Sequence, residues 1–201
     1  MKLKSALCAA ALLSAATVNT AAAMDQGDWL ARFGLSYVNP TSNNHEIVSV
    51  DSATSFTFNF EYMMTQNWGL ELLAAYPFKH DIELIDGTEV ASTKHLPPTL
   101  SVNYHFAPDS KFQPYLGLGL NYTLFFSEKT YGALEGVDLD LGGSWGLAGD
   151  LGADIMLNDK WFLNLSVRYI GIETKAKLDG ESIGKVKINP WVYSGNIGFR
   201  F

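Results

Sequence analysis

The chain lacks any apolar run long enough to cross a membrane as a helix, because none reaches the ~18 residues that such a helix needs. This holds although 47% of its 201 residues are hydrophobic. Only helices and closed barrels satisfy every backbone polar group in lipid. If the protein lies in a membrane, it must therefore do so as a closed β-barrel.

Cysteine and basic charge are also scarce. The single cysteine, Cys8, lies in a segment with a charged start, an apolar stretch and three consecutive alanines, which predicts a signal peptide over residues 1–23. Its removal leaves a barrel domain over residues 24–201 without disulfides or thiol chemistry. Two of the 14 basic residues are lost with it, so 12 remain against 21 acidic ones and the net charge becomes −9. That charge disfavours nucleic acid as a partner.

What the sequence has is an alternation with period two, in which one parity is almost wholly apolar and the other is small or polar. Eight segments show it: residues 29–38, 56–62, 68–78, 99–106, 115–122, 145–157, 161–169 and 191–201. The connections between them alternate short and long, as in outer-membrane barrels with short periplasmic turns and long outer loops. The pattern predicts an all-β fold, an eight-stranded antiparallel transmembrane β-barrel with long extracellular loops.

The tryptophans support this prediction, because all five open a strand on the apolar parity. Trp29, Trp68 and Trp161 are expected at the periplasmic edge, and Trp145 and Trp191 at the outer edge. Indole prefers the membrane interface, so two aromatic girdles are expected. The competing soluble barrel, with its apolar parity inward, fails on volume: eight strands enclose one small ligand, not about forty large apolar side chains.

Several stretches in order along the chain resemble one family. They are ELLAAYPF (71–78) followed by Lys79-His80, HLPPTL (95–100), KFQPYLGLGLNYTLFF (111–126), SWGLAG (144–149), Pro190-Trp191-Val192 and the closing Arg200-Phe201. With them the chain resembles the OmpW family of bacterial outer-membrane proteins over essentially all of residues 24–201.

The resemblance implies an eight-stranded barrel in the outer membrane, with a narrow, largely apolar cavity open to the outside and a link to uptake of small hydrophobic compounds. Family members also serve as receptors for phage or bacteriocins. The final Phe201 resembles the assembly signal that the barrel-assembly machinery recognises. Arg168 departs from the family, where an aromatic lining residue is expected.

The inward parity separates into two zones by height. Near the periplasmic end lies a mixed-sign set, interpreted as a lumen plug: Arg32, Glu61, Glu71, His105, Asp154 and Arg200. Buried charges in small barrels must be paired to be tolerated, which favours a structural ion-pair network over an ion pathway. Higher up are mostly small or apolar residues, interpreted as lining a substrate channel: Leu73, Ala75, Gly117, Gly119, Ala148, Arg168, Ile170 and Val192.

Two features bear on how a solute would move. In the last long connection the outward parity becomes charged while the inward parity stays apolar, with a turn signal at Asp179-Gly180. This indicates an extracellular extension lining an apolar funnel, or an ordinary hairpin packed on its neighbours. Pro77, Pro97 and Pro98 cannot donate to a ladder and suggest a lateral exit, or simply the ends of two strands.

Catalysis has weak support. His80 and His95 flank a connection that also holds Asp81 and Ser92, but nothing in their spacing is specific. We expect no enzyme, no cofactor and no metal site. The expected partners are outer-membrane lipid, lipopolysaccharide and small hydrophobic ligands, and a monomer is adequate because a closed barrel has no free edge. The sequence favours a hydrophobic uptake channel, with a structural or receptor barrel as the alternative.

Overall fold

A computed structural model describes residues 23–41, 48–84 and 86–201. The predicted signal peptide lies outside these residues except for Ala23. Eight long strands form the barrel: β1 (Trp29–Asn39), β3 (Ala53–Met63), β4 (Trp68–Ala75), β7 (Thr99–His105), β8 (Phe112–Thr130), β10 (Ser144–Met156), β11 (Trp161–Ile170) and β14 (Trp191–Arg200). Among the described residues, no helix is long and apolar enough to span a membrane.

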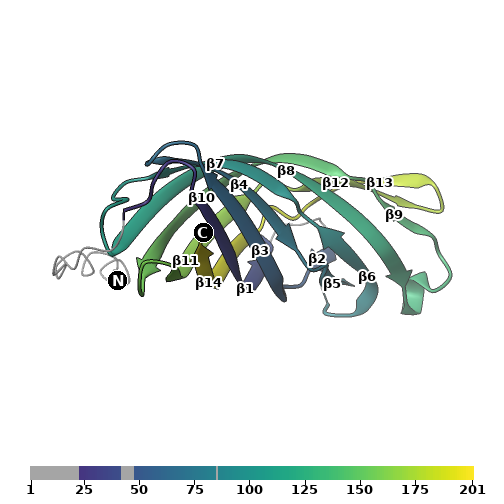
Figure 1. The fold of residues 1–201 in the computed structure, drawn as a ribbon. Coiled ribbons are helices and arrows are strands. Elements are labelled where there is room, and N and C mark those ends of the chain that lie inside the picture. Colours follow the sequence, from purple (N-terminus) through teal and green to yellow (C-terminus); the bar gives the residue numbers. More distant parts are fainter. Residues whose placement is uncertain (1–22, 42–47, 85) are drawn as a thin grey trace, which may run out of the picture.

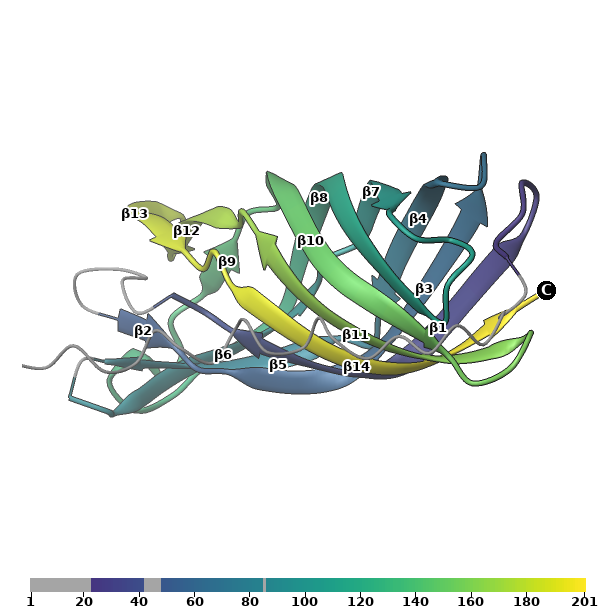
Figure 2. The same cartoon turned by 90° about the vertical axis from the view of Figure 1, so that its left-hand side faces the viewer.

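Each of these strands pairs antiparallel with the next, and β14 returns to pair with β1 (Figures 1 and 2). The closure is completed by two backbone hydrogen bonds between Trp29 and Phe201, of 2.9 and 3.0 Å. The predicted eight-stranded antiparallel barrel is confirmed.

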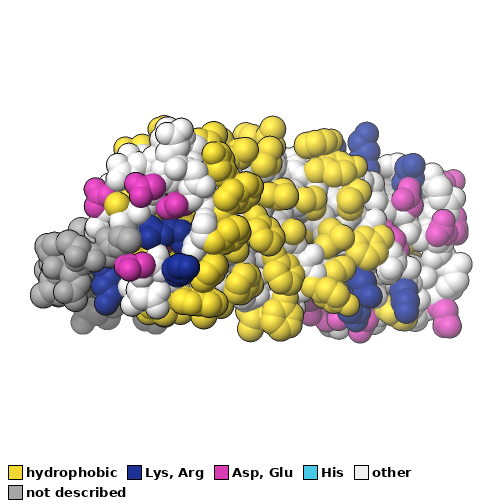
Figure 3. Space-filling model, in the orientation of Figure 1, with side chains coloured by type: hydrophobic (Ala, Val, Ile, Leu, Met, Phe, Trp, Pro, Cys, Tyr) yellow, Lys and Arg dark blue, Asp and Glu magenta, His cyan; other side chains and the backbone are white. Residues whose placement is uncertain are grey.

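The alternation in sequence becomes an alternation of burial. On β3, Phe56, Phe58 and Phe60 are between 41% and 61% exposed, whereas the intervening Thr57 and Asn59 are buried. A strand directs successive side chains to opposite faces, so one parity faces the lipid and the other faces the lumen. Figure 3 shows the result on one face of the molecule, an apolar band across the middle of the barrel with charged side chains beyond both of its edges.

The tryptophans form the two predicted girdles. Near one rim Trp29 packs against Tyr62, with ring centroids 5.1 Å apart, and Trp68 packs against Tyr104 at 4.9 Å. Near the other rim Trp145 lies 4.6 Å from the ring of Tyr122. All five tryptophans are at least 40% exposed, which suits side chains anchored at a membrane interface.

Beyond the outer girdle the long extracellular connections contain shorter strands that continue the wall. They are β2 (Val48–Val50), β5 (Phe78–Leu84), β6 (Glu89–Leu96), β9 (Leu139–Leu141), β12 (Glu173–Leu178) and β13 (Glu181–Lys187), together with the 3-10 helix η1 (Gly132–Leu134). β8 does not end near Tyr122 but runs on to Thr130 and pairs with β6. Figure 1 shows this extension at the end of the barrel opposite the C-terminus.

The alternation over residues 68–78 predicts that Phe78 faces outward on the same parity as Tyr76, and this prediction is wrong. Tyr76 is 68% exposed, whereas Phe78 is 2% exposed. Between them Pro77 cannot donate to a ladder, β4 ends at Ala75, and the chain resumes as β5 with the opposite parity. The uninterrupted alternation puts Ile82 and Leu84 on the outward parity, which indicates a bulge or a fold-over in this connection. The change of parity turns both toward the interior.

The last hairpin follows its prediction. Asp179 and Gly180 both have positive φ, 49° and 82°, as a tight turn between twisted strands requires. Lys175 and Lys185 are exposed, whereas Ile172, Ala176, Val186 and Ile188 on the other face are buried. The apolar face therefore lines the interior above the membrane.

We expect Leu118→Arg to lower the free energy of unfolding by about 2–4 kcal/mol, because Leu118 on β8 faces the middle of the apolar band and is 67% exposed. The measurement is denaturant unfolding of the barrel in lipid vesicles. Ile183→Arg on β13 is the matched control, since Ile183 is also exposed but lies outside the band. Equal losses in the two variants would contradict the assignment of the outer face to lipid.

Candidate functional site

The periplasmic end of the lumen is closed by an apolar cluster. Met24, Leu30, Met63, Met156 and Phe162 pack together and are at most 2% exposed. The sequence analysis missed this cluster, although four of its members lie on the inward parity at or beside strand ends. The signal that could have found them was an inward parity that becomes apolar again below the charged residues.

Above this cluster the side chain of Arg32 on β1 connects three strands. Its Nη1 donates to Glu61 at 2.7 Å and to Glu71 at 3.3 Å, and its Nη2 and Nε donate to Asp154 at 2.6 and 3.1 Å. All four side chains are fully buried. The bidentate contact with Asp154 is the geometry that a guanidinium and a carboxylate prefer.

A second arginine joins the same network. Arg168 on β11 donates through Nη2 to Glu71 and to Asp150, both at 2.6 Å, so Glu71 contacts both guanidinium groups. His105 lies 3.0 Å from Glu61 through Nε2. The sequence analysis had assigned Arg168 to the channel lining and had not included Asp150 in the plug. The structure brings both into the charged layer.

Polar side chains occupy the remaining space at this height. Asn59 and Asn103 donate to Glu71 and Glu61 at 3.2 and 3.0 Å, and Asn164 donates to Asp154 at 2.8 Å. We call this set, with Arg32, Arg168, His105, Glu61, Glu71, Asp150 and Asp154, the charged layer. Each buried charge in it has an opposite charge within hydrogen-bond distance, which is the condition for tolerating charges out of water.

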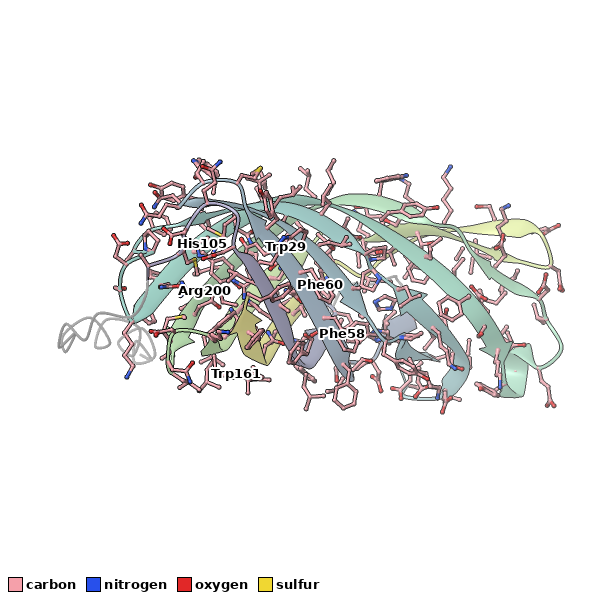
Figure 4. All side chains as sticks on the ribbon, in the orientation of Figure 1. Trp29, Phe58, Phe60, His105, Trp161 and Arg200 are labelled. Carbon is pink, nitrogen blue, oxygen red and sulfur yellow. The ribbon has the colours of Figure 1, made fainter. Side chains whose placement is uncertain are left out.

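Arg200, predicted to lie in the plug, occupies a different place. Its Nη1 donates to the backbone oxygen of Ala23 at 2.6 Å and lies 3.7 Å from Asp28. Figure 4 shows it toward the end of the barrel where the C-terminus lies. Arg200 therefore lies at the periplasmic rim, below the charged layer, and Asp28 is the partner that it keeps once the predicted signal peptide with Ala23 is removed.

Directly above the charged layer lies a small cavity of about 20 Å³. Of the predicted lining residues, it touches Leu73, Arg168, Ile170 and Val192. A volume of this size corresponds to about one water molecule. We call it the lower cavity.

The other four predicted lining residues lie away from it. Ala148 packs within the apolar core above the charged layer, and Ala75 packs against the same core. A side chain at Gly117 or Gly119 would overlap Asn103 or Ser101, so these glycines accommodate neighbouring side chains and leave no open space.

A larger cavity of about 190 Å³, the upper cavity, lies within the extracellular extension. Its described lining contains no Asp, Glu, Lys or Arg and comes mainly from β2, β5, β6, β9, β12 and β13. The predicted inward face of the last hairpin, Ala176, Leu178, Val186 and Ile188, contributes one side. The face from β5 and β6 was not predicted as lining: Ile82 and Leu84 on the outward parity indicated a bulge or a fold-over in this connection, but not the parity change at Pro77 that turns them inward.

Two histidines separate the cavities. His80 and His95 both line the upper cavity, and His95 also lines the lower one. The rings stack 4.8 Å apart, and His95 stacks on Phe78 at 5.4 Å. Burial lowers the pKa of both, that of His95 to about 3, so both are neutral near pH 7.

The histidines do not form a catalytic site with the nearby Asp81 and Ser92. His80 contacts the backbone oxygen of Asp51 through Nδ1, and Ser92 lies 3.1 Å from the hydroxyl of Tyr131. Among the residues described, no group of three or more His, Cys, Asp or Glu side chains is arranged to hold a metal ion.

The wall beside His95 is interrupted. The register of β4 with β7 ends at Leu73 opposite Thr99, and that of β5 with β6 begins at Phe78 opposite His95. Residues 74–77 and 96–98 lie between, and they include the three prolines. In the described structure the two sides of the interruption hydrogen-bond to their other neighbours and not to each other. The backbone N–H of Tyr76 donates to Phe56 on β3, and the backbone oxygen of Pro98 accepts from Tyr122 on β8.

A model of the OmpW family matches residues 25–201. The chain belongs to this family. It is 40% identical to outer membrane protein W of Vibrio cholerae serotype O1 over 218 residues, covering 99% of this chain and 100% of the relative. The crystal structure of OprG from Pseudomonas aeruginosa superimposes with a TM-score of 0.80 at 36% identity, over 89% of this chain and 98% of that one.

A more distant relative is the dibenzothiophene metabolism operon protein PahQ of Pseudomonas aeruginosa, 26% identical over 153 residues, which cover 73% of this chain and 71% of PahQ. The family, the closed barrel and the outer-membrane proteins among its relatives place this OmpW-family protein in the bacterial outer membrane.

We expect Arg32→Met to lower the free energy of unfolding by about 3–5 kcal/mol, because it leaves Glu61, Glu71 and Asp154 without one of their buried cations. Lys177→Met removes an exposed pair with Asp140 of 3.8 Å and is expected to cost at most about 1 kcal/mol. Denaturant unfolding in vesicles compares the two. A loss in Arg32→Met no larger than in the control would mean that the charged layer does not depend on Arg32.

Proposed function

We propose that this OmpW-family barrel takes up small hydrophobic molecules from outside the cell and releases them sideways into the outer membrane. The observation that carries the proposal is an apolar cavity of about 190 Å³ at the outer end of a lumen that is filled with paired charges farther down.

The upper cavity suits an apolar solute, because burying apolar surface there gains about 25 cal/mol per Å² removed from water. Its lining is mainly Val, Ile, Leu and Ala side chains from the extracellular extension. The charged lysines of the same hairpin point away from it, so the outer face of the wall is wettable while the inner face is not.

Passage straight down is opposed at two levels. The interior narrows from about 190 Å³ to about 20 Å³ below the histidines. Below that, an apolar solute would have to displace side chains of the charged layer, and separating Arg32 or Arg168 from a carboxylate would leave a buried charge unpaired. The apolar cluster at the periplasmic end adds a further barrier.

The interrupted wall supports lateral release. Pro97 is buried and lines the lower cavity, so the interruption between the β4–β5 and β6–β7 junctions adjoins the point at which the interior narrows. Pro77, Pro97 and Pro98 have no N–H with which to close this stretch. One relative, PahQ, is named for an operon of dibenzothiophene metabolism. Dibenzothiophene is an apolar aromatic compound, so this name supports small hydrophobic molecules as the class of substrate.

The filled lower lumen favours a second candidate, a structural or receptor barrel whose extracellular strands contact a partner. In that case the upper cavity would be a packing defect of the extension, and blocking it would change nothing in uptake.

We expect Ala176→Trp to reduce accumulation of dibenzothiophene to the level of cells that lack the barrel, because Ala176 is 1% exposed and its side chain lies in the upper cavity. Uptake is measured with equal amounts of folded barrel at the surface. Ser182→Trp is the matched control, since Ser182 is an exposed residue of the same hairpin, and it should leave uptake unchanged. Equal uptake by cells with and without the barrel would contradict the transport proposal and favour the structural or receptor barrel.

Lateral release is tested by cysteines at Ala75 and Leu96, on opposite sides of the interruption, joined by a short thiol crosslinker. We expect the crosslink to abolish uptake and its reduction to restore it. A disulfide between cysteines at Lys79 and Lys94, which are already register partners, should have no effect. Unchanged uptake in the crosslinked protein would place the exit elsewhere.

A further inference from the structure

The outer face of the last hairpin carries a cluster of lysines. Four of the chain's 14 Lys and Arg residues lie there, although the formal net charge of the chain is −7. They are Lys175 and Lys177 on β12 and Lys185 and Lys187 on β13, and all four are exposed. We call these four side chains the lysine face. Figure 1 shows the hairpin at the end of the barrel opposite the C-terminus.

The register of the hairpin places two of these lysines directly opposite each other. Lys175 on β12 is the partner of Lys185 on β13. Side chains in such a position have Cβ atoms about 4.5–5.5 Å apart, and like charges there destabilise the pair of strands. Lys175 forms no ion pair with any residue that the structure describes, and Lys185 lies 3.8 Å from Glu173. The hairpin therefore holds two positive charges together at a cost that Glu173 only partly offsets.

The carboxylates on this face are few and loosely paired. Glu173 is shared, since it lies 3.8 Å from Lys185 and 3.9 Å from Lys187, and Asp140 on β9 lies 3.8 Å from Lys177. Exposed pairs of this kind contribute little to stability. On the outward parity of β9, β12 and β13, four lysines thus stand against two carboxylates. Other acidic side chains of this sheet, among them Asp179, lie at the turn, farther from the membrane band.

Protection of a sheet edge does not account for the lysine face. Lysines on an edge strand prevent pairing with another chain, and β13 is at the edge of its sheet. However, β12 is the central strand, with β13 on one side and β9 on the other. Lys175 and Lys177 on β12 therefore guard no edge, and their charge calls for a partner outside the sheet.

The lysine face continues the lipid-facing surface upward. Tyr169 and Trp191 of the outer girdle pack with ring centroids 5.3 Å apart, and Lys187 precedes Trp191 by four residues. Four residues span about 13 Å at 3.3 Å each, or roughly 10 Å of height at a tilt near 40°. The headgroup layer of a phospholipid bilayer is only about 5–8 Å deep on each side. An anion that meets these lysines must therefore belong to a lipid with a taller headgroup.

We propose that the lysine face binds the phosphate groups on the core sugars of lipopolysaccharide in the surrounding outer leaflet. Lys175 and Lys185 hold one phosphate between them, and each ammonium group donates a charge-assisted hydrogen bond to a phosphate oxygen. A shared anion replaces the repulsion between the two lysines by attraction to a common partner. The contact fixes the wall of the extension within the saccharide layer, whether or not the barrel transports hydrophobic molecules.

The test places the full barrel in phosphatidylcholine vesicles with a rising mole fraction of dansyl-labelled rough lipopolysaccharide. Energy transfer from the tryptophans to the label measures the lipopolysaccharide beside the protein. Parallel samples hold the same lipopolysaccharide with its phosphates removed, or labelled phosphatidylglycerol, which is anionic but has a short headgroup. We expect intact lipopolysaccharide to reach half-maximal transfer at a mole fraction about five- to thirtyfold lower than either, the effect of one or two lysines at an anionic surface.

A matched pair of variants assigns the effect to the hairpin. Lys175→Gln with Lys185→Gln removes the opposed charges, and we expect it to raise the half-maximal mole fraction about five- to thirtyfold. Lys79→Gln with Lys94→Gln removes two register partners on β5 and β6, where Lys79 already pairs with Asp81 at 2.7 Å. This control should change the value less than about twofold.

Denaturant unfolding in phosphatidylcholine alone separates binding from a structural role. There the hairpin variant should be at least as stable as the unaltered barrel, because it has lost a repulsion between like charges. A less stable variant would mean that the lysines support the hairpin itself, and this would contradict the proposal.

Three results in the transfer assay would overturn the inference. They are equal transfer to intact and dephosphorylated lipopolysaccharide, equal transfer to phosphatidylglycerol, and equal losses in the two double variants. The last two would indicate a diffuse attraction to anionic lipid. Each of these results leaves the uptake proposal standing, because the dibenzothiophene assay tests that proposal separately.

Discussion

The structure depends on the requirement that backbone N–H and C=O groups within lipid find partners inside the protein. A sheet meets it only by closing on itself, which β14 does by pairing with β1 from Leu30 opposite Arg200 to Asn39 opposite Trp191. Closure with eight strands fixes a narrow bore, and a narrow bore fixes what the inward parity can hold. The apolar outer face, the girdles and the crowded lumen all follow from this single constraint.

Within that bore the chain uses three kinds of filling at three heights. Apolar side chains close the periplasmic end, paired charges occupy the middle, and apolar walls surround the cavity above the membrane. The charged layer is a lattice across strands, because Arg32 joins β1 to β3, β4 and β10, while Arg168 joins β11 to β4 and β10. Since Glu71 contacts both arginines, the two halves of the layer are one unit. Such a unit resists opening along the barrel axis, and this resistance is one reason for proposing a side route for an apolar solute.

The sequence alone predicted the barrel, its strand count, its girdles and the polarity of the last hairpin. Each of these follows from a local alternation of apolar and polar residues or from the residue type at a strand end. The sequence indicated a bulge or a fold-over in the connection after Pro77, but not the change of parity that occurs there. A parity change after a broken strand moves Phe78 and His80 from one face to the other without altering the composition of the segment. It also did not distinguish room from filling: Gly117 and Gly119 suggest an open channel, but in three dimensions they accommodate Asn103 and Ser101 from the neighbouring strand. Pairing between strands that are not neighbours, as between Arg168 on β11 and Glu71 on β4, depends on the heights of the side chains in the barrel, which only the register sets.

β8 gives the molecule its height. It is one continuous strand of 19 residues from Phe112 to Thr130, and at about 3.3 Å per residue it is roughly 60 Å long. Tilted by about 40°, it still stands well above an apolar band of about 25 Å. The extension that surrounds the upper cavity therefore stands above the level of the acyl chains. Under the proposed uptake function, a poorly soluble molecule would cross the hydrated layer of headgroups and sugars inside this protein wall and not through the hydrophilic coat itself.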